Sequence, residues 1–287
     1  MMRKIILLSA AMLVMMSAYA SKKLPKKDIA LQLYSVQDIF KNFDSTIANV
    51  AGMGYTAVEA ANFENGKFYG KTPEEYKAAI EKAGLRLLSS HIVKMLTETE
   101  LETKDFSESL AWWDDAITAH LSAGTKYIVM PWMGLSKSLA DLQVYCDYYN
   151  AVGKKCKERG VSFGYHNHEY EYEKIEGVRM LDYMLEHTNP EYVFFELDVY
   201  WTVIGRQSPV AYFHKYPGRF LMLHIKDHTT LGESGMVGFD AIFKNTDVAG
   251  TKYIVVEVEP IDNAEECVRG SIGYLRACPL VKKTYEK

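Results

Sequence analysis

The sequence has few cysteines for its length. Only four of the 287 residues are cysteine, at Cys146, Cys156, Cys267 and Cys278. None of them forms the Cys-x-x-Cys spacing of a zinc ribbon, and four cysteines in so long a chain do not make a disulfide scaffold. We therefore expect a fold held together by a hydrophobic core rather than by crosslinks.

Concentrated positive charge is also missing. The formal net charge is −4, and no run of three or more basic residues occurs; the pairs Lys22-Lys23 and Lys26-Lys27 stand near the amino terminus. Proteins that bind nucleic acid neutralise phosphates with clusters of lysine and arginine. The composition therefore argues against a nucleic-acid partner.

Long hydrophobic runs are absent except at the start of the chain. Arg3 and Lys4 precede the apolar residues 5–16, and Ser17-Ala-Tyr-Ala20 follows. The run is too short to span a membrane, and the small residues after it are typical of a signal peptidase site. We expect residues 1–20 to be a signal peptide cleaved after Ala20, and residues 21–287 to be a protein exported to the periplasm or secreted, with no membrane span. That address permits one or two disulfides, whose pairing the sequence leaves open.

The remainder of the chain alternates strand-like and helical patterns at intervals of roughly thirty residues. The strand-like runs are nearly continuously apolar, which is typical of parallel strands that are covered on both faces. We predict eight strands, at residues 29–34, 57–59, 85–92, 127–130, 162–166, 192–198, 220–225 and 253–259. We predict helices between and after them, at residues 45–53, 73–84, 109–123, 139–159, 178–187, 209–216, 239–245 and 264–278.

Eight βα units in strict alternation predict an α/β fold, a TIM (β/α)8 barrel in a single domain. The alternative is a doubly wound open sheet. No glycine-rich phosphate loop follows the first strand, which counts against that alternative. No stretch of the sequence has the composition of a linker to a second domain.

Four successive strands end in pairs of ionisable residues. The pairs are His166 and His168, Glu196 and Asp198, His224 and Lys226, and Glu257 and Glu259. Residues two apart in a strand share one face, and the active site of a TIM barrel lies at the carboxyl ends of its strands. So many charges in a barrel mouth need a counter-ion, because burying them unpaired is costly.

A divalent metal ion supplies that counter-ion. Imidazole nitrogens combined with carboxylate oxygens suit Mn²⁺, Zn²⁺, Co²⁺ or Fe²⁺ better than Ca²⁺ or Mg²⁺, which prefer shells of oxygen alone. The sequence therefore predicts one divalent metal site and leaves the identity of the metal open.

Several short motifs together resemble the xylose isomerase-like TIM barrels, a family of sugar phosphate isomerases and epimerases, keto-sugar epimerases, inosose dehydratases and the endonuclease IV group. The matching pieces are Gln32-Leu-Tyr34, Gly54-Tyr-x-x-Val-Glu59, Ser90-His91, Tyr165-His-Asn-His168, Leu197-Asp198-x-x-Trp201, His224-Ile-Lys-Asp227 and Val256-Glu257. The resemblance implies that His166, Asp198, His224 and Glu257 bind the metal. Gln32, Glu59, His91, Trp132 and Trp201 are candidate substrate-binding residues.

The chain departs from the family pattern at the fifth strand. Epimerases of this group carry a glutamate there and use it with the glutamate of strand eight as an acid/base pair, whereas this chain has His166. His168, Glu257 or Lys226 is then the candidate second proton carrier. If His166 is a ligand, a glutamate at this position should keep the metal. Trp201 stands where the endonucleases carry a further histidine ligand, which weakens a DNA-cutting interpretation.

The resemblance implies chemistry on a small sugar or keto-sugar. Our first interpretation is a metal-dependent sugar isomerase or epimerase that abstracts a proton next to a carbonyl and forms an enediolate. The alternative is a keto-sugar dehydratase or 3-keto-glycoside lyase that uses the same residues. A third interpretation, from a different class, is a sugar-binding protein without catalytic activity. The oligomeric state is open, with a homo-oligomer among the alternatives.

Overall fold

The structure, a computed structural model, describes residues 24–36, 39, 41–259 and 262–286. The predicted signal peptide, residues 1–20, lies outside the described residues. Within the described part of the chain, no helix combines the length and apolar character needed to cross a bilayer.

Eight parallel strands close into a barrel, in the order β1-β10-β9-β8-β5-β4-β3-β2. Each predicted strand is present, which confirms the predicted TIM barrel. The strands are β1 (Ala30–Gln32), β2 (Ala57–Ala60), β3 (Arg86–His91), β4 (Tyr127–Met130), β5 (Ser162–His166), β8 (Val193–Asp198), β9 (Met222–Ile225) and β10 (Tyr253–Val256).

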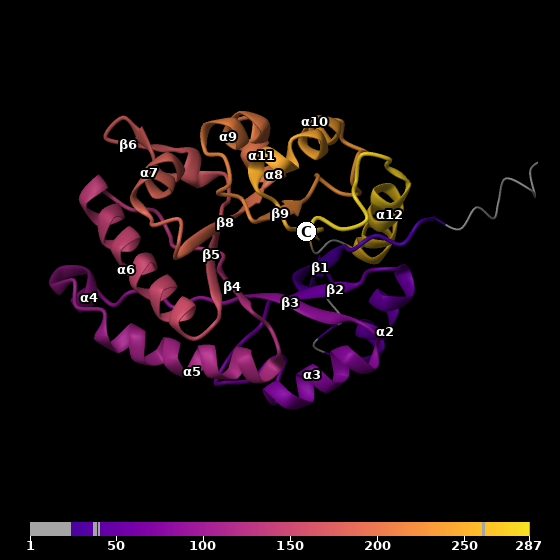
Figure 1. Cartoon of the computed structure of the whole chain (residues 1–287), viewed down its shortest axis with the longest axis horizontal. Helices are drawn as coiled ribbons and strands as arrows, with labels where there is room; N and C mark the ends of the chain where they lie inside the picture. The colour runs from indigo at the N-terminus through magenta and orange to yellow at the C-terminus, as the bar shows by residue number, and fades with distance from the viewer. Residues whose placement is uncertain (1–23, 37–38, 40, 260–261, 287) are drawn as a thin grey trace, which may run out of the picture.

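Helices surround the barrel, with α3 and α5 below the strands in Figure 1, α6 to the left of them, and α9 and α10 above them. The predicted helices correspond to α2 (Phe43–Met53), α3 (Pro73–Lys82), α5 (Ser107–Ala123), α6 (Leu139–Glu158), α7 (Met180–His187), α9 (Pro209–Lys215), α10 (Phe239–Lys244) and α12 (Ala264–Ala277). Local signals mark their ends. Thr72 and Glu75 form a capping box at the start of α3, and Gly124, at φ 87°, ends α5 in the left-handed conformation that glycine adopts without strain.

Some short elements were not predicted. They are the helices α4 (Glu98–Thr103), α8 (Val199–Ile204) and α11 (Thr246–Ala249), the 3₁₀ turns η1 (Leu33–Ser35) and η3 (Tyr170–Tyr172), and the hairpin strands β6 (Lys174–Ile175) and β7 (Val178–Arg179). Two of them shorten predicted elements. The first strand ends at Gln32 because its side chain accepts a hydrogen bond from Tyr34 N and starts η1. The helix predicted from residue 178 begins at Met180 because Val178 pairs with Ile175 in the hairpin.

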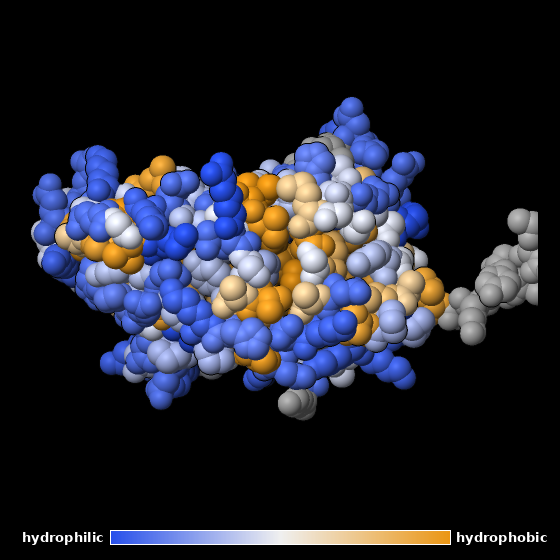
Figure 2. Space-filling view, turned by 90° about the horizontal axis from the view of Figure 1, so that it is seen from above, coloured by the Kyte–Doolittle hydropathy of each residue, from blue (hydrophilic) through white to orange (hydrophobic). Residues whose placement is uncertain are grey.

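The side chains inside the barrel change from apolar to polar along the barrel axis. Its amino-terminal part is filled by a small apolar cluster that includes Ala30, Ala57, Met222 and Val255. Two residues further along the same strands, the inward side chains are Gln32, Glu59, His224 and Glu257. A larger core between sheet and helices holds most other buried apolar side chains. On the face of the molecule drawn in Figure 2, apolar surface gathers near the middle and polar residues cover most of the rest.

Candidate active site

A pocket of about 440 Å³ opens at the carboxyl ends of the strands. Its volume is within the range of roughly 300–1,000 Å³ that small-molecule sites occupy. Five of the residues expected in the site line it: Gln32, His91, His166, His168 and Glu257. Trp132, another candidate, is 47% exposed and is not among the lining residues.

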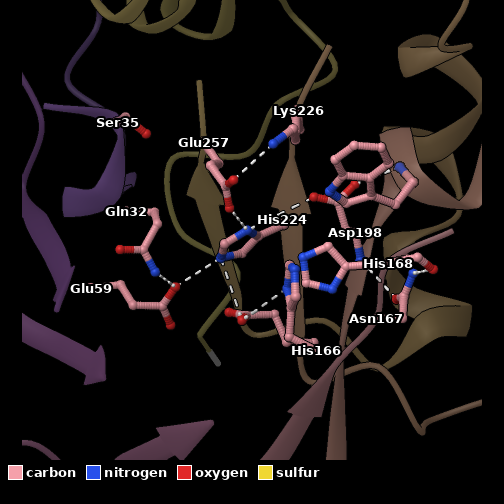
Figure 3. Close-up of polar contacts among 12 residues, drawn as sticks. Gln32, Ser35, Glu59, His166, Asn167, His168, Asp198, His224, Lys226 and Glu257 are labelled. Atoms are coloured by element: carbon pink, nitrogen blue, oxygen red, sulfur yellow. Dashed lines mark hydrogen bonds and ion pairs between the residues drawn. The ribbon is translucent and has the colours of Figure 1, made fainter. Parts of the chain in front are cut away.

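The structure brings the four expected metal ligands together. His166 ends β5, Asp198 ends β8, His224 lies in β9 and Glu257 follows β10, and ligand atoms of all four lie within 4.8 Å of one another. All four side chains are buried, and Figure 3 shows His224 between Glu257 and Asp198. Residues far apart in the sequence therefore converge because neighbouring parallel strands end side by side.

Three atoms of this group are buried without a hydrogen-bond partner among the described residues, namely His166 Nδ1, Asp198 Oδ2 and His224 Nδ1. Asp198 Oδ2 and His224 Nδ1 lie 3.9 Å apart. Glu257 Oε2 is 2.9 Å from His224 Nδ1, but the two groups are not aligned for a hydrogen bond. Buried polar atoms without partners are costly. Oxygen and nitrogen atoms that face a common point without bonding to one another fit a divalent cation, so the residues present fit the predicted metal.

Beneath His224 lies Glu59, which is completely buried. Its Oε1 accepts hydrogen bonds from Gln32 Nε2 at 2.8 Å and from His224 Nε2 at 2.7 Å, and Ser89 donates to its Oε2 at 2.5 Å. Burial alone would raise the pKa of Glu59, but His91 and His224 hold that pKa well below its usual range. Glu59 was expected to contact substrate, yet its carboxylate lies under His224 and outside the lining of the pocket.

Glu196 is a second buried carboxylate at this level of the barrel, and no role was assigned to it from the sequence. Its Oε2 lies 2.7 Å from His91 Nε2, 3.4 Å from His224 Nε2 and 3.5 Å from His166 Nδ1. Its Oε1 has no partner within the part of the chain that is described. His91, His166, Glu196 and His224 form a further group with ligand atoms within 4.8 Å of one another. The pairing of Glu196 with Asp198, two residues apart, was the signal available in the sequence.

Lys226 is a buried cation between two carboxylates. Its Nζ lies 2.7 Å from Glu257 Oε1 and also bonds Glu259, and it lies 5.0 Å from the centre of the Trp201 ring. Burial opposes its charge, but Glu257 and Asp198 raise the pKa of Lys226 above its usual value. Lys226 therefore stays charged and orients Glu257, so that Oε2 is the oxygen left for a cation.

His168 lies beside the ligand group. Its ring centre is 5.0 Å from that of His166 and 5.8 Å from that of Trp201. Burial lowers the pKa of His168 to about 4, so the imidazole is neutral near pH 7. Its backbone N–H donates to Glu171 Oε2 at 2.8 Å, and Tyr165 donates to Glu171 Oε1 at 2.5 Å. Glu171 thus anchors the loop that carries His168; no pattern in the sequence identified it.

A parallel barrel with a mixed histidine and carboxylate cluster at its carboxyl end defines a class of metal-binding (β/α)8 proteins. Residues 47–278 match the model of the family described as xylose isomerase-like TIM barrel. The chain belongs to this family, as its sequence motifs indicated.

Relatives with assigned names include two inosose dehydratases. The protein from Geobacillus kaustophilus is 24% identical over 200 residues, which cover 64% of this chain and 61% of that protein. The protein from Bacillus cereus is 23% identical over 258 residues, covering 76% of this chain and 82% of that protein. This chain therefore spans about three fifths of the length of the first of these relatives.

Similar folds are also known from crystal structures. A sugar phosphate isomerase/epimerase from Parabacteroides distasonis is 33% identical, with a TM-score of 0.83 over 91% of this chain and 98% of that chain. The IolI protein, solved with a bound zinc atom, is 12% identical, with a TM-score of 0.65 over 89% of this chain and 98% of that chain. The second likeness concerns the fold alone.

Proposed function

We propose that this protein is a metal-dependent dehydratase of a keto-sugar or of a related cyclic ketone that carries hydroxyl groups. The observation that carries the proposal is the convergence of His166, Asp198, His224 and Glu257 at the carboxyl ends of the strands, with buried ligand atoms that lack partners among the described residues. His166 and Glu257 also line the pocket. The similarity to inosose dehydratases supports it.

His166, Asp198, His224 and Glu257 would hold the metal, through one atom each. When bound there, a divalent ion polarises a carbonyl and stabilises the negative charge that develops on its oxygen. Lys226 keeps Glu257 in its orientation, and Asp198 is fixed because its Oδ1 accepts a hydrogen bond from Trp201 N at 2.8 Å.

His168 is the proposed base. It lines the pocket, is neutral near pH 7 and lies next to the ligand group. It would take the proton from the carbon next to the carbonyl, and the electron pair of that C–H bond would form a carbon–carbon double bond. The hydroxyl group on the next carbon would leave and depart as water after taking up a proton. His91, which lines the same pocket, would hydrogen-bond a substrate hydroxyl.

Isomerisation or epimerisation is the second candidate, and the observation in its favour is the 33% identity to the Parabacteroides protein of that name. Both reactions begin with the same proton abstraction. Elimination ranks first because this chain has His166 at strand five. The family's epimerases have a glutamate there, which exchanges protons together with a second glutamate on strand eight. The buried unpartnered ligand atoms count against a sugar-binding protein without activity.

Metal analysis combined with a screen of keto-sugars and inososes in D2O tests the proposal. We expect one equivalent of Mn²⁺, Zn²⁺, Co²⁺ or Fe²⁺ per chain and a product that has lost one water. A product that keeps all the atoms of the substrate except for a hydrogen exchanged for deuterium at carbon would favour isomerisation or epimerisation. Less than about a tenth of an equivalent of metal after reloading would count against the site itself.

We also propose that the enzyme acts outside the cytoplasm. The basis is the pattern of residues 1–20 in the sequence. Amino-terminal sequencing of the protein from its own cells would begin at Ser21; an intact amino terminus on protein recovered from the cytoplasm would contradict this proposal.

A further inference from the structure

Two buried carboxylates lie behind the two histidines of the proposed metal site. We infer that Glu59 and Glu196 are positioning residues, which hold His224 and His166 in the ring orientation and tautomer that bind the cation. The inference rests on the proposed metal-dependent function. It also has a consequence for position 166, at the end of the fifth strand. Glu196 would orient a histidine at this position and would repel a glutamate.

The case for Glu59 rests on the two nitrogens of His224. Nε2 lies 2.7 Å from Glu59 Oε1, and a carboxylate can only accept a hydrogen bond, so Nε2 carries a proton. Nδ1 faces Asp198 and Glu257 and is then the nitrogen left for the cation, which displaces the proton of that nitrogen when it binds. Carboxylates commonly orient metal-binding histidines in this way. Glu59 is itself immobilised by Gln32 and Ser89, so it holds the imidazole rigidly.

The case for Glu196 rests on His166. Nδ1 of His166 is buried, has no partner among the described residues and lies 3.5 Å from Glu196 Oε2. The two nitrogens of an imidazole point in different directions, and His166 lines the pocket. Nε2 is therefore left for the cation, while a small rotation of the ring lets Nδ1 donate to Glu196.

A carboxylate at position 166 would meet a different environment. Its oxygens would lie next to Glu196, which is completely buried, with Glu59 at the same level of the barrel. Like charges at such distances repel strongly when the side chains are buried. Contrary to the expectation from the sequence, the glutamate that the family's epimerases carry at this strand would therefore bind the cation poorly in this chain, unless the charge of Glu196 were removed as well.

The decisive experiment compares His166→Glu with the double variant His166→Glu/Glu196→Gln. Binding of Mn²⁺ and of Zn²⁺ is measured by competition with a chromophoric chelator, and folding is checked by circular dichroism. We expect the single variant to lose about 10- to 100-fold or more in affinity, and the double variant to recover most of that loss. His166→Glu/Glu100→Gln is the matched control, because Glu100 is a buried carboxylate that bonds Thr97 and Ser109 outside the site.

Three results would overturn the inference for Glu196. One is a His166→Glu variant that binds metal as tightly as the wild type. Another is a double variant that binds no better than the single variant, although both are folded. The last is a wild type that binds two equivalents and a Glu196→Gln variant that binds one, since Glu196 would then be a ligand of a second ion in the group with His91, His166 and His224.

The nitrogen of His224 that binds the metal tests Glu59 directly. Nitrogen-15 spectra of histidine-labelled, zinc-loaded protein should show the proton of His224 on Nε2 in the wild type and in Ser89→Ala. Glu59→Gln should lose this preference and about 10- to 100-fold in metal affinity. A wild-type proton on Nδ1, or unchanged affinity in Glu59→Gln, would refute the assignment.

These results separate the inference from the function. If the wild type binds metal and turns over a keto-sugar while Glu59→Gln and Glu196→Gln bind metal normally, the positioning roles fail and the proposed function stands. If the wild type binds no metal, the proposed function fails, and the inference fails with it.

Discussion

The two ends of the barrel arrange their polar groups in opposite ways. At the amino-terminal end, Arg86 makes two hydrogen bonds to Asp28, of 3.1 and 2.7 Å, and Tyr253 donates to Glu286 at 2.8 Å. At the carboxyl-terminal end, Asp198 Oδ2 and His224 Nδ1 are buried without a hydrogen-bond partner among the described residues. The polar groups of the first end bond one another, whereas those of the second are arranged for something that the chain itself does not provide.

The difference separates two uses of polar groups in the barrel. Paired groups at the amino-terminal end contribute to folding, because each donor has an acceptor. Unpaired groups at the carboxyl-terminal end lower the stability of the metal-free protein and are compensated when a cation binds. Substitutions at the amino-terminal end should therefore change the unfolding free energy, whereas those at the carboxyl-terminal end should change metal binding and turnover.

The largest effect is expected at Asp198 and His224. Asp198→Asn keeps Oδ1 as the acceptor for Trp201 N at the start of α8 but removes the charge, and His224→Ala removes a ligand. Both variants should lose metal and turnover and still fold, as residues of a barrel mouth rather than of its packed layers. Metal content, turnover and circular dichroism measure this.

Asp198→Ala is the companion variant at this position. It removes the helix cap as well as the charge, so it should also lose about 1 kcal/mol of unfolding free energy relative to Asp198→Asn. Collapse of the dichroism signal in Asp198→Asn or in His224→Ala would show instead that these residues are structural.

His168→Ala should cost roughly two to four decades in turnover and leave the metal in place, because a general base contributes about that much. His187→Ala, at the exposed carboxyl end of helix α7, is the control and should behave as the wild type. If His168→Ala empties the metal site, His168 is a ligand. If it keeps full turnover, Glu257 or Lys226 becomes the preferred base.

His120 sharpens the comparison, because its Nε2 is also buried without a partner in the described chain. Its ring packs between Phe63 and Phe68, with centres 4.6 and 4.8 Å away, rather than beside other ligand atoms. An isolated unpartnered atom therefore does not mark a site; several that converge do.

Burial lowers the pKa of His120 to about 4, below the value of about 6.5 in an unfolded chain. The unfolded chain therefore takes up the proton first, and this contribution to stability is complete above pH 6.5 and lost as the pH falls to 4. The shift corresponds to about 3 kcal/mol. His120→Leu should flatten the loss of unfolding free energy in that window and keep turnover. An unchanged pH dependence would contradict the assignment.

The smallest effect is expected at the amino-terminal end. Arg86→Ala breaks the pair with Asp28, in which the two side chains are 43% and 27% exposed. It should lower the unfolding free energy by about 1 kcal/mol or less and leave metal affinity and turnover unchanged. Urea titration and metal competition on the same samples test both parts, and weaker metal binding would show that the two ends are coupled.

Much of the fold was predictable because it depends on local patterns. All eight strands follow from apolar runs at regular spacing, and most helices from amphipathic segments with recognisable ends. The short helix α8 was missed because it begins directly after β8, where the side chain of Asp198 accepts a hydrogen bond from Trp201 N. A residue expected only as a metal ligand is also a helix cap, and no periodic pattern reveals a helix of that length.

The candidate site was predictable to the extent that strand ends define it. The paired residues at the ends of four strands, together with the family motifs, identified the four candidate ligands that the structure brings together. The place of Glu59 under His224, the position of Glu196 beside three imidazoles and the anchoring of His168 by Glu171 were not predictable. They depend on which strand ends face one another across the barrel.

The sequence by itself determined the class of fold, the strands and the types of ligand, because periodicity and residue chemistry are carried by neighbouring residues in the chain. Only the tertiary structure decided which carboxylates stand behind the imidazoles and which face the pocket. Glu59 and His224 are 165 residues apart in the sequence, and they form a 2.7 Å hydrogen bond only because the barrel closes. Closure of the sheet sets the distances across its interior, and those distances separate a candidate ligand from a residue that holds a ligand in place.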